Sequence, residues 1–278
     1  IDGDNTISTI DHRPSTIDHR PSTIDHRAPT VLAMDLYEPI DELKALAPDV
    51  WVVDGPIVRM AYPGFGSIPF ASRMTVVRLG GGGLWVWSPI ALAPELKTRI
   101  DALGPVAHLV SPNFIHYAHL AAWKQAYPEA VAWASPGVRE RARAQKIDVR
   151  FDRDLGDEPP GDWRDDIDQL IFEGSRVLRE VEFFHRTSRT LIIADLIENF
   201  EPQKLTFVER MLMRVGGVCA PDGKAPSDVR LTFLGHHDVA RRSLERMTHW
   251  GPERIVIAHG KLFEHDGERE LRRAFRWV

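Results

Sequence analysis

The sequence predicts an α/β fold in which β-sheets are sandwiched between helices. The first observation is a set of short apolar runs at 106–110, 190–194 and 254–258, which fit strands buried on both faces. The second is that segments with helical spacing of apolar residues separate many of the predicted strands. The third is an ordinary globular composition, with 43% hydrophobic and 27% charged residues in a chain of 278.

Strands are predicted where apolar or alternating runs end in turn residues. After a short opening segment at Tyr37–Leu46, four consecutive glycines at 80–83 join two such runs. They indicate a hairpin turn and not a phosphate-binding loop, because no helix and no Lys-Ser/Thr pair follows. In chain order, the predicted strands are Val50–Val53, Met74–Leu79, Leu84–Trp87, Val106–Val110, Ala130–Trp133, Asp148–Phe151, Asp168–Phe172, Glu180–Phe184, Thr190–Ala194, Val229–Leu234 and Arg254–Ala258.

Helices are predicted where capping and breaking residues frame an amphipathic segment. Ala93–Leu103 has Pro94 in its first turn and Gly104 and Pro105 after its end. A second helix follows His119 and ends before Pro128. The others are a basic helix from Ser135 to Ala144, a helix over 207–215, one from His237 to Trp250, and Glu268–Phe275.

The helix over 207–215 carries an apolar stripe. Its members are Phe207, Val208, Met211, Leu212 and Val215. Core packing is the preferred interpretation of such a stripe, and a lid that lines a substrate site is the alternative.

The stretch from Leu178 to Phe200 organises the chain. Its first strand alternates Glu180 and Glu182 with apolar residues, which predicts one solvated face, and its second strand is apolar throughout. His185 ends the first strand and Asp195 ends the second. Such a pair is typical of metal sites at sheet ends, although a turn histidine and a helix-capping aspartate would explain it as well.

Composition excludes several classes of partner and site. A net charge of −5 and a pI of about 6.2 argue against nucleic acid. The single cysteine, Cys219, excludes an internal disulfide and a cysteine-rich zinc site, and is consistent with a reducing, cytoplasmic location. No apolar run approaches the roughly 18 residues that cross a bilayer. We therefore expect a small-molecule substrate, and neither nucleic acid nor a membrane as partner.

The amino-terminal segment contains a seven-residue repeat. Residues 8–29 repeat Ser-Thr-Ile-Asp-His-Arg-Pro, with the last unit altered. A proline in each unit excludes a coiled coil, and one apolar residue per unit is too little for a packed core. We predict a disordered tail at 1–33, with Met34 as a natural start, and one folded domain at 34–278. The repeat histidines would bind metal weakly at most.

Histidine or aspartate follows three of the predicted buried strands. His116 and His119 come after 106–110, Asp195 after 190–194, and His259 after 254–258. Ligands collect beyond the carboxyl ends of strands in open α/β layers, so we expect these residues to converge. A set of histidines and a carboxylate without cysteine suits Zn²⁺, Fe or Mn²⁺.

The sequence of these segments resembles the metallo-β-lactamase superfamily over residues 34–278. It is closer to a branch described as a domain of unknown function. The resemblance is carried by Ser111-Pro112-Asn113 with His116, by Phe184-His185 with 188–191, and by Ala258-His259-Gly260. It implies an αββα sandwich with metal at one edge.

The resemblance also implies which positions hold metal. Superfamily members place His-x-His-x-Asp-His after this strand, and here those positions are Pro112, Phe114, His116 and Tyr117. His185 matches the third histidine of the first metal site, Asp195 the bridging aspartate, and His259 the last histidine. We expect one divalent metal, with zinc first and iron or manganese as alternatives, held by three of His116, His185, Asp195 and His259. His119 is expected as a ligand or as a residue that contacts one.

Two functions are compatible with these residues. The first is a mononuclear metal-dependent hydrolase of a small ester, lactone, thioester or phosphodiester, with no catalytic side chain assigned. The second is a metal-free scaffold that binds a small ligand or a partner. The remaining histidines of the folded part are assigned structural or surface roles: His108, His236, His237, His249 and His265.

Overall fold

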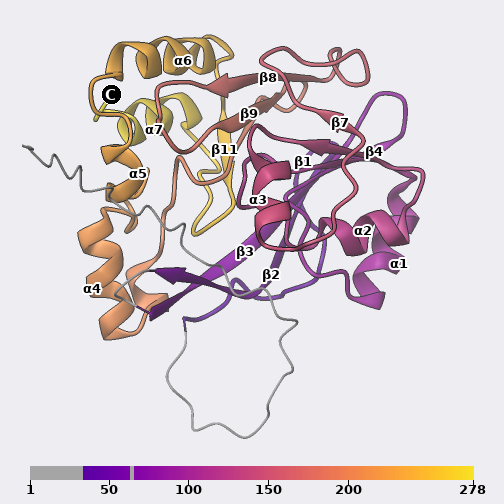
Figure 1. Ribbon diagram of the computed structural model, residues 1–278, viewed down its shortest axis with the longest axis horizontal. Coiled ribbons are helices and arrows are strands. Elements are labelled where there is room, and N and C mark those ends of the chain that lie inside the picture. The colour runs from indigo at the N-terminus through magenta and orange to yellow at the C-terminus, as the bar shows by residue number, and fades with distance from the viewer. Residues whose placement is uncertain (1–33, 63–65) are drawn as a thin grey trace, which may run out of the picture.

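The computed structural model describes residues 34–62 and 66–278. Their strands form two sheets (Figure 1). The larger has the order β1-β2-β3-β4-β5-β6-β7, with bounds Lys44–Ala47, Val50–Tyr62, Gly66–Arg78, Leu84–Trp87, Val106–Val110, Val131–Ala134 and Arg153–Asp154. The smaller has the order β11-β10-β9-β8, with bounds Arg254–Ile257, Thr190–Ile193, Glu180–His185 and Ile167–Phe172. The tail predicted at 1–33 lies outside the described residues.

Helices cover the outer face of each sheet, and the two inner faces pack together. The larger sheet packs against α1, α2 and α3 (Pro94–Leu103, Leu120–Ala126 and Val138–Ala144), and the smaller against α6 and α7 (His237–His249 and Gly267–Ala274). An apolar layer rich in Trp and Val fills the space between the sheets. This arrangement is the αββα sandwich that the resemblance implies, and the α/β prediction is confirmed.

Parallel pairing directs the chain ends of key strands to one edge of the sandwich. β5 runs parallel to β4 and β6, and β10 runs parallel to β11. The four glycines at 80–83 join β3 to β4, and these two strands pair antiparallel, so the predicted hairpin is confirmed. The carboxyl ends of β5, β10 and β11 lead to Ser111, Asp195 and His259, so the segments with candidate ligands leave the sheets in the same region.

Two strand predictions are wrong. Val229–Leu234 forms no strand, because Val229–Leu231 belongs to the helix α5 (Ser227–Leu231) and a turn follows, from which the buried Phe233 packs in the core beside the smaller sheet. Residues 148–151 form no strand, and the short strand β7 begins two residues later. The sequence also predicts no strand at β1, which pairs with β2 at the sheet edge.

The apolar stripe of 207–215 does not pack in the core. It belongs to α4 (Phe207–Gly216), which begins with a capping box between Thr206 and Glu209. Phe207, Val208, Met211 and Val215 are exposed, whereas Met213 is buried. The preferred interpretation of this stripe is therefore wrong, because α4 turns a different face toward the body.

The prediction that Glu180 and Glu182 lie on a solvated strand face is also wrong. Glu180 and Glu182 are completely buried, because β9 is an interior strand between β8 and β10 and a helical layer covers this face. Both side chains are consequently part of the interior.

Among the described residues, no helix is both long and apolar enough to cross a membrane.

Candidate metal centre

Three of the predicted ligands lie together at one edge of the sandwich. Within the described part of the chain, His116, Asp195 and His259 form a group whose potential ligand atoms are all within 4.8 Å of one another. His116 lies in the turn between β5 and α2, Asp195 follows β10, and His259 follows β11. Residues far apart in the sequence thus meet where the three strands end.

Hydrogen bonds orient both imidazoles. Nδ1 of His116 lies 2.6 Å from the hydroxyl of Ser88, and Nδ1 of His259 donates to the carbonyl of Ala71 at 2.8 Å. Each Nε2 consequently faces Asp195. A histidine that binds metal through one ring nitrogen ordinarily has its other nitrogen held in this way.

The carboxylate of Asp195 has one oxygen that faces both imidazoles. This oxygen, Oδ1, lies 3.4 Å from Nε2 of His116 and 3.4 Å from Nε2 of His259. Oδ2 accepts a hydrogen bond from Nδ2 of Asn113 at 2.6 Å and lies 3.2 Å from Nε2 of His116. Charge-assisted hydrogen bonds of this type are usually about 2.7–2.9 Å long. Atoms that bind one tetrahedral metal at about 2.0–2.1 Å are about 3.3–3.4 Å apart, so the three residues fit a metal.

Charge at the site favours the ionised form of Asp195. Burial by itself raises the pKa of this carboxyl, but His116 and His259 outweigh burial and hold the pKa well below its usual range. The aspartate is therefore a carboxylate, which is the form that binds a cation.

Two residues that carry no sequence-based site prediction support Asp195 from behind. Asn113 and Glu180 are both fully buried. Glu180 accepts hydrogen bonds from the backbone N–H groups of Ala194 and Asp195 and from Nδ2 of Asn113. The signal that could have marked Glu180 is a pair of acidic residues at alternate positions of an otherwise apolar strand, a pattern that instead predicted a solvated face.

The segment that carries His259 is tied to the larger sheet. Arg73 is buried, donates to the carbonyls of Ile257 and Gly260, and pairs with Asp54 at 2.6 Å. Gly260 has a φ of 101°, and a side chain there would meet the backbone of Asn199 at 2.3 Å. The glycine after His259 is thus required by this close approach, and Arg73 fixes the same turn from the other side.

His185 and His119 do not join the group. The prediction that His185 converges with Asp195 is corrected: His185 pairs with Thr190 at the start of β10, whereas Asp195 follows the end of that strand. Its Nδ1 lies 2.7 Å from Ser188 Oγ, and burial lowers its pKa. His119 occupies the position before α2. The helix itself begins at Leu120.

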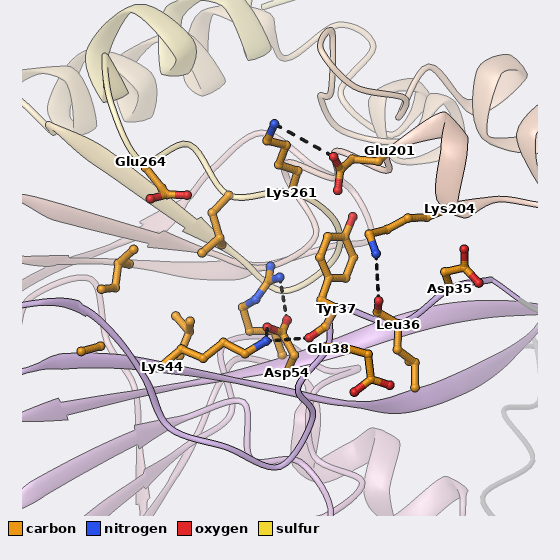
Figure 2. A pocket seen from close by; sticks show the side chains of 15 residues that line it. Asp35, Leu36, Tyr37, Glu38, Lys44, Asp54, Glu201, Lys204, Lys261 and Glu264 are labelled. Atoms are coloured by element: carbon orange, nitrogen blue, oxygen red, sulfur yellow. Dashed lines mark hydrogen bonds and ion pairs between the residues drawn. The ribbon is translucent and has the colours of Figure 1, made fainter.

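The other sequence features of interest lie apart from this centre. His108 is buried and accepts a hydrogen bond from the indole of Trp133, as its structural assignment implies. A pocket of about 740 Å³ lies between the opening segment and the turn after His259, and Figure 2 shows the side chains that line it. Several of its charges pair with each other, for example Lys44 with Asp54 at 2.8 Å, and its lining does not include the three clustered residues.

Comparison with known proteins agrees with this description of the fold. A metallo-β-lactamase from Pontibacter korlensis is 13% identical, with a TM-score of 0.57 over 87% of this chain and 98% of that one. The metallo-β-lactamase FIM-1 from Pseudomonas aeruginosa, in its mono-zinc form, is 12% identical, with a TM-score of 0.56 over 85% and 93%. The metal-soaked flavodiiron core of Flv1 from Synechocystis is 11% identical, with a TM-score of 0.54 over 88% and 61%.

The sequence comparisons identify a family without an assigned function. A search of curated proteins found no match. Residues 63–213, more than half of the chain, match the family described as Domain of unknown function (DUF4336). The chain therefore belongs to the DUF4336 family, and its fold is that of the metallo-β-lactamase superfamily.

Proposed function

We propose that this protein binds one divalent metal through His116, Asp195 and His259 and is a metal-dependent hydrolase of a small molecule. One observation carries the proposal: a single carboxylate oxygen of Asp195 lies at the same 3.4 Å from Nε2 of both imidazoles. Hydrogen bonds to Ser88 and Ala71 hold both rings in this orientation. The three donors are thus held in place by hydrogen bonds within the chain.

The donor set favours zinc, with iron and manganese as alternatives. Two imidazoles and a carboxylate suit these ions, and three protein ligands leave a coordination position open. The mono-zinc form of FIM-1 supports a single metal in a fold of this type. When bound, such a metal supplies water activation near neutral pH and polarisation of a carbonyl or phosphoryl oxygen. The expected substrates are esters, lactones, thioesters or phosphodiesters.

A metal-free scaffold that binds a small ligand is the second candidate. It is favoured by the residues that occupy the first two histidine positions of the superfamily motif, Pro112 and Phe114, neither of which is a metal ligand. The same two residues argue against a second metal. The two candidates differ in one measurable quantity, the metal content of the purified chain.

Elemental analysis of protein without a histidine tag tests the proposal. After loading with Zn²⁺ and removal of excess metal, we expect about one metal per chain in the wild type and in His249→Ala, an exposed control. We expect none in Asp195→Ala, because that change removes both the charge and a ligand oxygen. A content of two metals would contradict the mononuclear site, and none with Zn²⁺, Fe²⁺ or Mn²⁺ would favour the scaffold.

The hydrolase part of the proposal has its own test. The loaded wild type and Asp195→Ala are assayed against a panel of the four substrate classes, with and without a chelator. We expect activity toward at least one class, lost both in the variant and with the chelator. A metal-loaded protein that hydrolyses none of them would leave a metal-binding protein that is not a hydrolase of these classes.

A further inference from the structure

Glu180 lies directly behind the turn that carries Asp195. It is the first residue of β9 and has no exposed surface. Its Oε1 accepts from the N–H of Ala194 at 2.8 Å and is 3.4 Å from the N–H of Leu196. The N–H of Asp195 lies 3.1 Å from Oε1 and 2.9 Å from Oε2. The Glu180 side chain therefore accepts hydrogen bonds from three consecutive backbone N–H groups: those of Ala194, Asp195 and Leu196.

Asn113 connects this carboxylate to both halves of the candidate site. Its Nδ2 donates to Oε2 of Glu180 at 2.8 Å and to Oδ2 of Asp195 at 2.6 Å. Its Oδ1 accepts from the N–H of Ile115 at 2.8 Å and is 3.3 Å from the N–H of His116. The amide is thus fully used, and it links the turn of His116 to the turn of Asp195.

The network depends on two acceptor oxygens at position 180. Oε1 faces backbone N–H groups and Oε2 faces the amide of Asn113, so neither position accommodates a donor. A glutamine in place of Glu180 has the same shape but only one acceptor, and its NH₂ group would oppose an N–H. The consequence at either oxygen would be a buried, unsatisfied donor next to Asp195.

Glu182 provides an internal comparison on the same strand face. It is fully buried like Glu180, but its oxygens accept no backbone N–H or amide N–H among the described residues, and its carboxyl instead contributes a side-chain hydrogen bond to Glu180. Burial, followed by the neighbouring Glu180, raises the pKa of this carboxyl well above its usual value. The neutral amide of glutamine closely matches a neutral carboxyl. We therefore expect Glu182→Gln to leave its surroundings nearly unchanged, whereas Glu180→Gln disrupts the hydrogen bonds around Asp195.

We propose that Glu180 is a positioning residue that directs Oδ1 of Asp195 toward the two imidazoles, by clamping the 194–196 backbone and the shared amide of Asn113. Glu180 acts through Asp195 and makes no contact of its own with His116 or His259 in these bonds. This inference rests on the proposed function, because positioning matters only if the group binds metal. It assigns a role to a buried acid that lies outside the ligand set.

The test compares Glu180→Gln with Glu182→Gln in the full chain. Zinc affinity is measured by competition with a chelator, and amide hydrogen exchange of residues 194–196 is measured in metal-free protein. For Glu180→Gln we expect zinc binding weakened about 10- to 100-fold, which is typical for loss of a group that orients a ligand, and faster exchange of the three amides. For Glu182→Gln we expect affinity within about twofold of wild type.

A cobalt-loaded series separates positioning from general destabilisation. Glu180→Gln should change the visible ligand-field spectrum of bound Co²⁺, whereas Leu191→Ala, which leaves a cavity in the apolar cluster between the smaller sheet and its helices, should not. Glu180→Asp keeps a carboxyl group with two oxygens and has a shorter reach, so it should recover part of the affinity. It also replaces Glu180→Gln if that variant does not fold.

Failure of the two proposals gives different results. If the wild type binds none of zinc, cobalt, iron and manganese, the proposed metal site is wrong. If the wild type binds zinc and Glu180→Gln binds it within twofold, or Glu182→Gln is weakened equally, the positioning role of Glu180 is wrong.

Discussion

At the scale of single residues, the register of β9 against β10 decides which side chain supports Asp195. The two strands are antiparallel, so His185 at the end of β9 pairs with Thr190, and Glu180 at the start of β9 lies beside Asp195. The motif resemblance assigns the neighbouring position to the histidine. The structure instead places the carboxyl group of Glu180 there. It accepts hydrogen bonds from backbone N–H groups and is not one of the three clustered residues, His116, Asp195 and His259.

Replacement of His185 separates these two descriptions. We expect His185→Gln to keep about one zinc per loaded chain, because the structure places this residue at the far end of the strand. Its stability should fall by about 1–2 kcal/mol, through loss of the buried bond to Ser188. Elemental analysis and urea unfolding measure the two quantities. Loss of the metal in a folded variant would restore the histidine to the ligand set.

At the scale of secondary-structure elements, α4 shows how an amphipathic pattern can misassign the buried face. Thr206 and Glu209 form the capping box that starts the helix, and Gly217, with a φ of 77°, ends it. Met213 packs with Phe70 and Phe200, while Met211 is half exposed. The apolar face that the pattern emphasises therefore points away from the body of the protein.

Identical substitutions at two methionines of α4 test this orientation. We expect Met213→Ala to lower the free energy of unfolding by about 2–5 kcal/mol, because it leaves a cavity in a packed cluster. Met211→Ala should change it by no more than about 0.5 kcal/mol, because this side chain is 50% exposed. Urea unfolding at 25 °C gives both values. An equal loss at the two positions would mean that α4 buries Met211 as well.

At the scale of the whole molecule, polar groups in the interior link the two sheets and make stability depend on pH. Arg73 of β3 donates to two carbonyls at the end of β11, across the sandwich. His108 of β5 accepts from Trp133 within the layer between the sheets and contacts Trp163, whose ring centroid is 5.1 Å away. Burial lowers the pKa of His108 to about 4, with a smaller opposing effect of Asp162.

This shift predicts a loss of stability in mild acid. Below about pH 6.5 the unfolded chain protonates His108 and the folded chain does not, so the free energy of unfolding falls as pH decreases toward about 4. The contribution of His108 is up to about 3 kcal/mol. We expect His108→Phe to show a smaller decrease than wild type across this range. Parallel curves for His108→Phe and wild type would contradict a buried neutral imidazole.

Local pattern was sufficient for much of the fold and for part of the candidate site. Apolar runs and turn residues predicted β4, β5, β8, β9, β10, β11, α1, α6 and α7 to within about two residues at each end. Strand ends followed by histidine or aspartate marked His116, Asp195 and His259, because side chains at carboxyl ends of strands gather at one edge. These signals depend only on residues that are close in sequence.

Tertiary structure decided the features that depend on residues distant in sequence. Strand register brought Glu180 and not His185 to Asp195, and the position of β9 inside its sheet buried two acids that alternate like a solvated face. Asn113 became the link between two turns because β5 and β10 end side by side in space. Periodicity describes one element at a time, whereas register, burial and hydrogen-bond partners are set by how elements pack together. For this reason the sequence alone determined the elements and the strand-end ligands, and only the folded chain decided which buried groups support them.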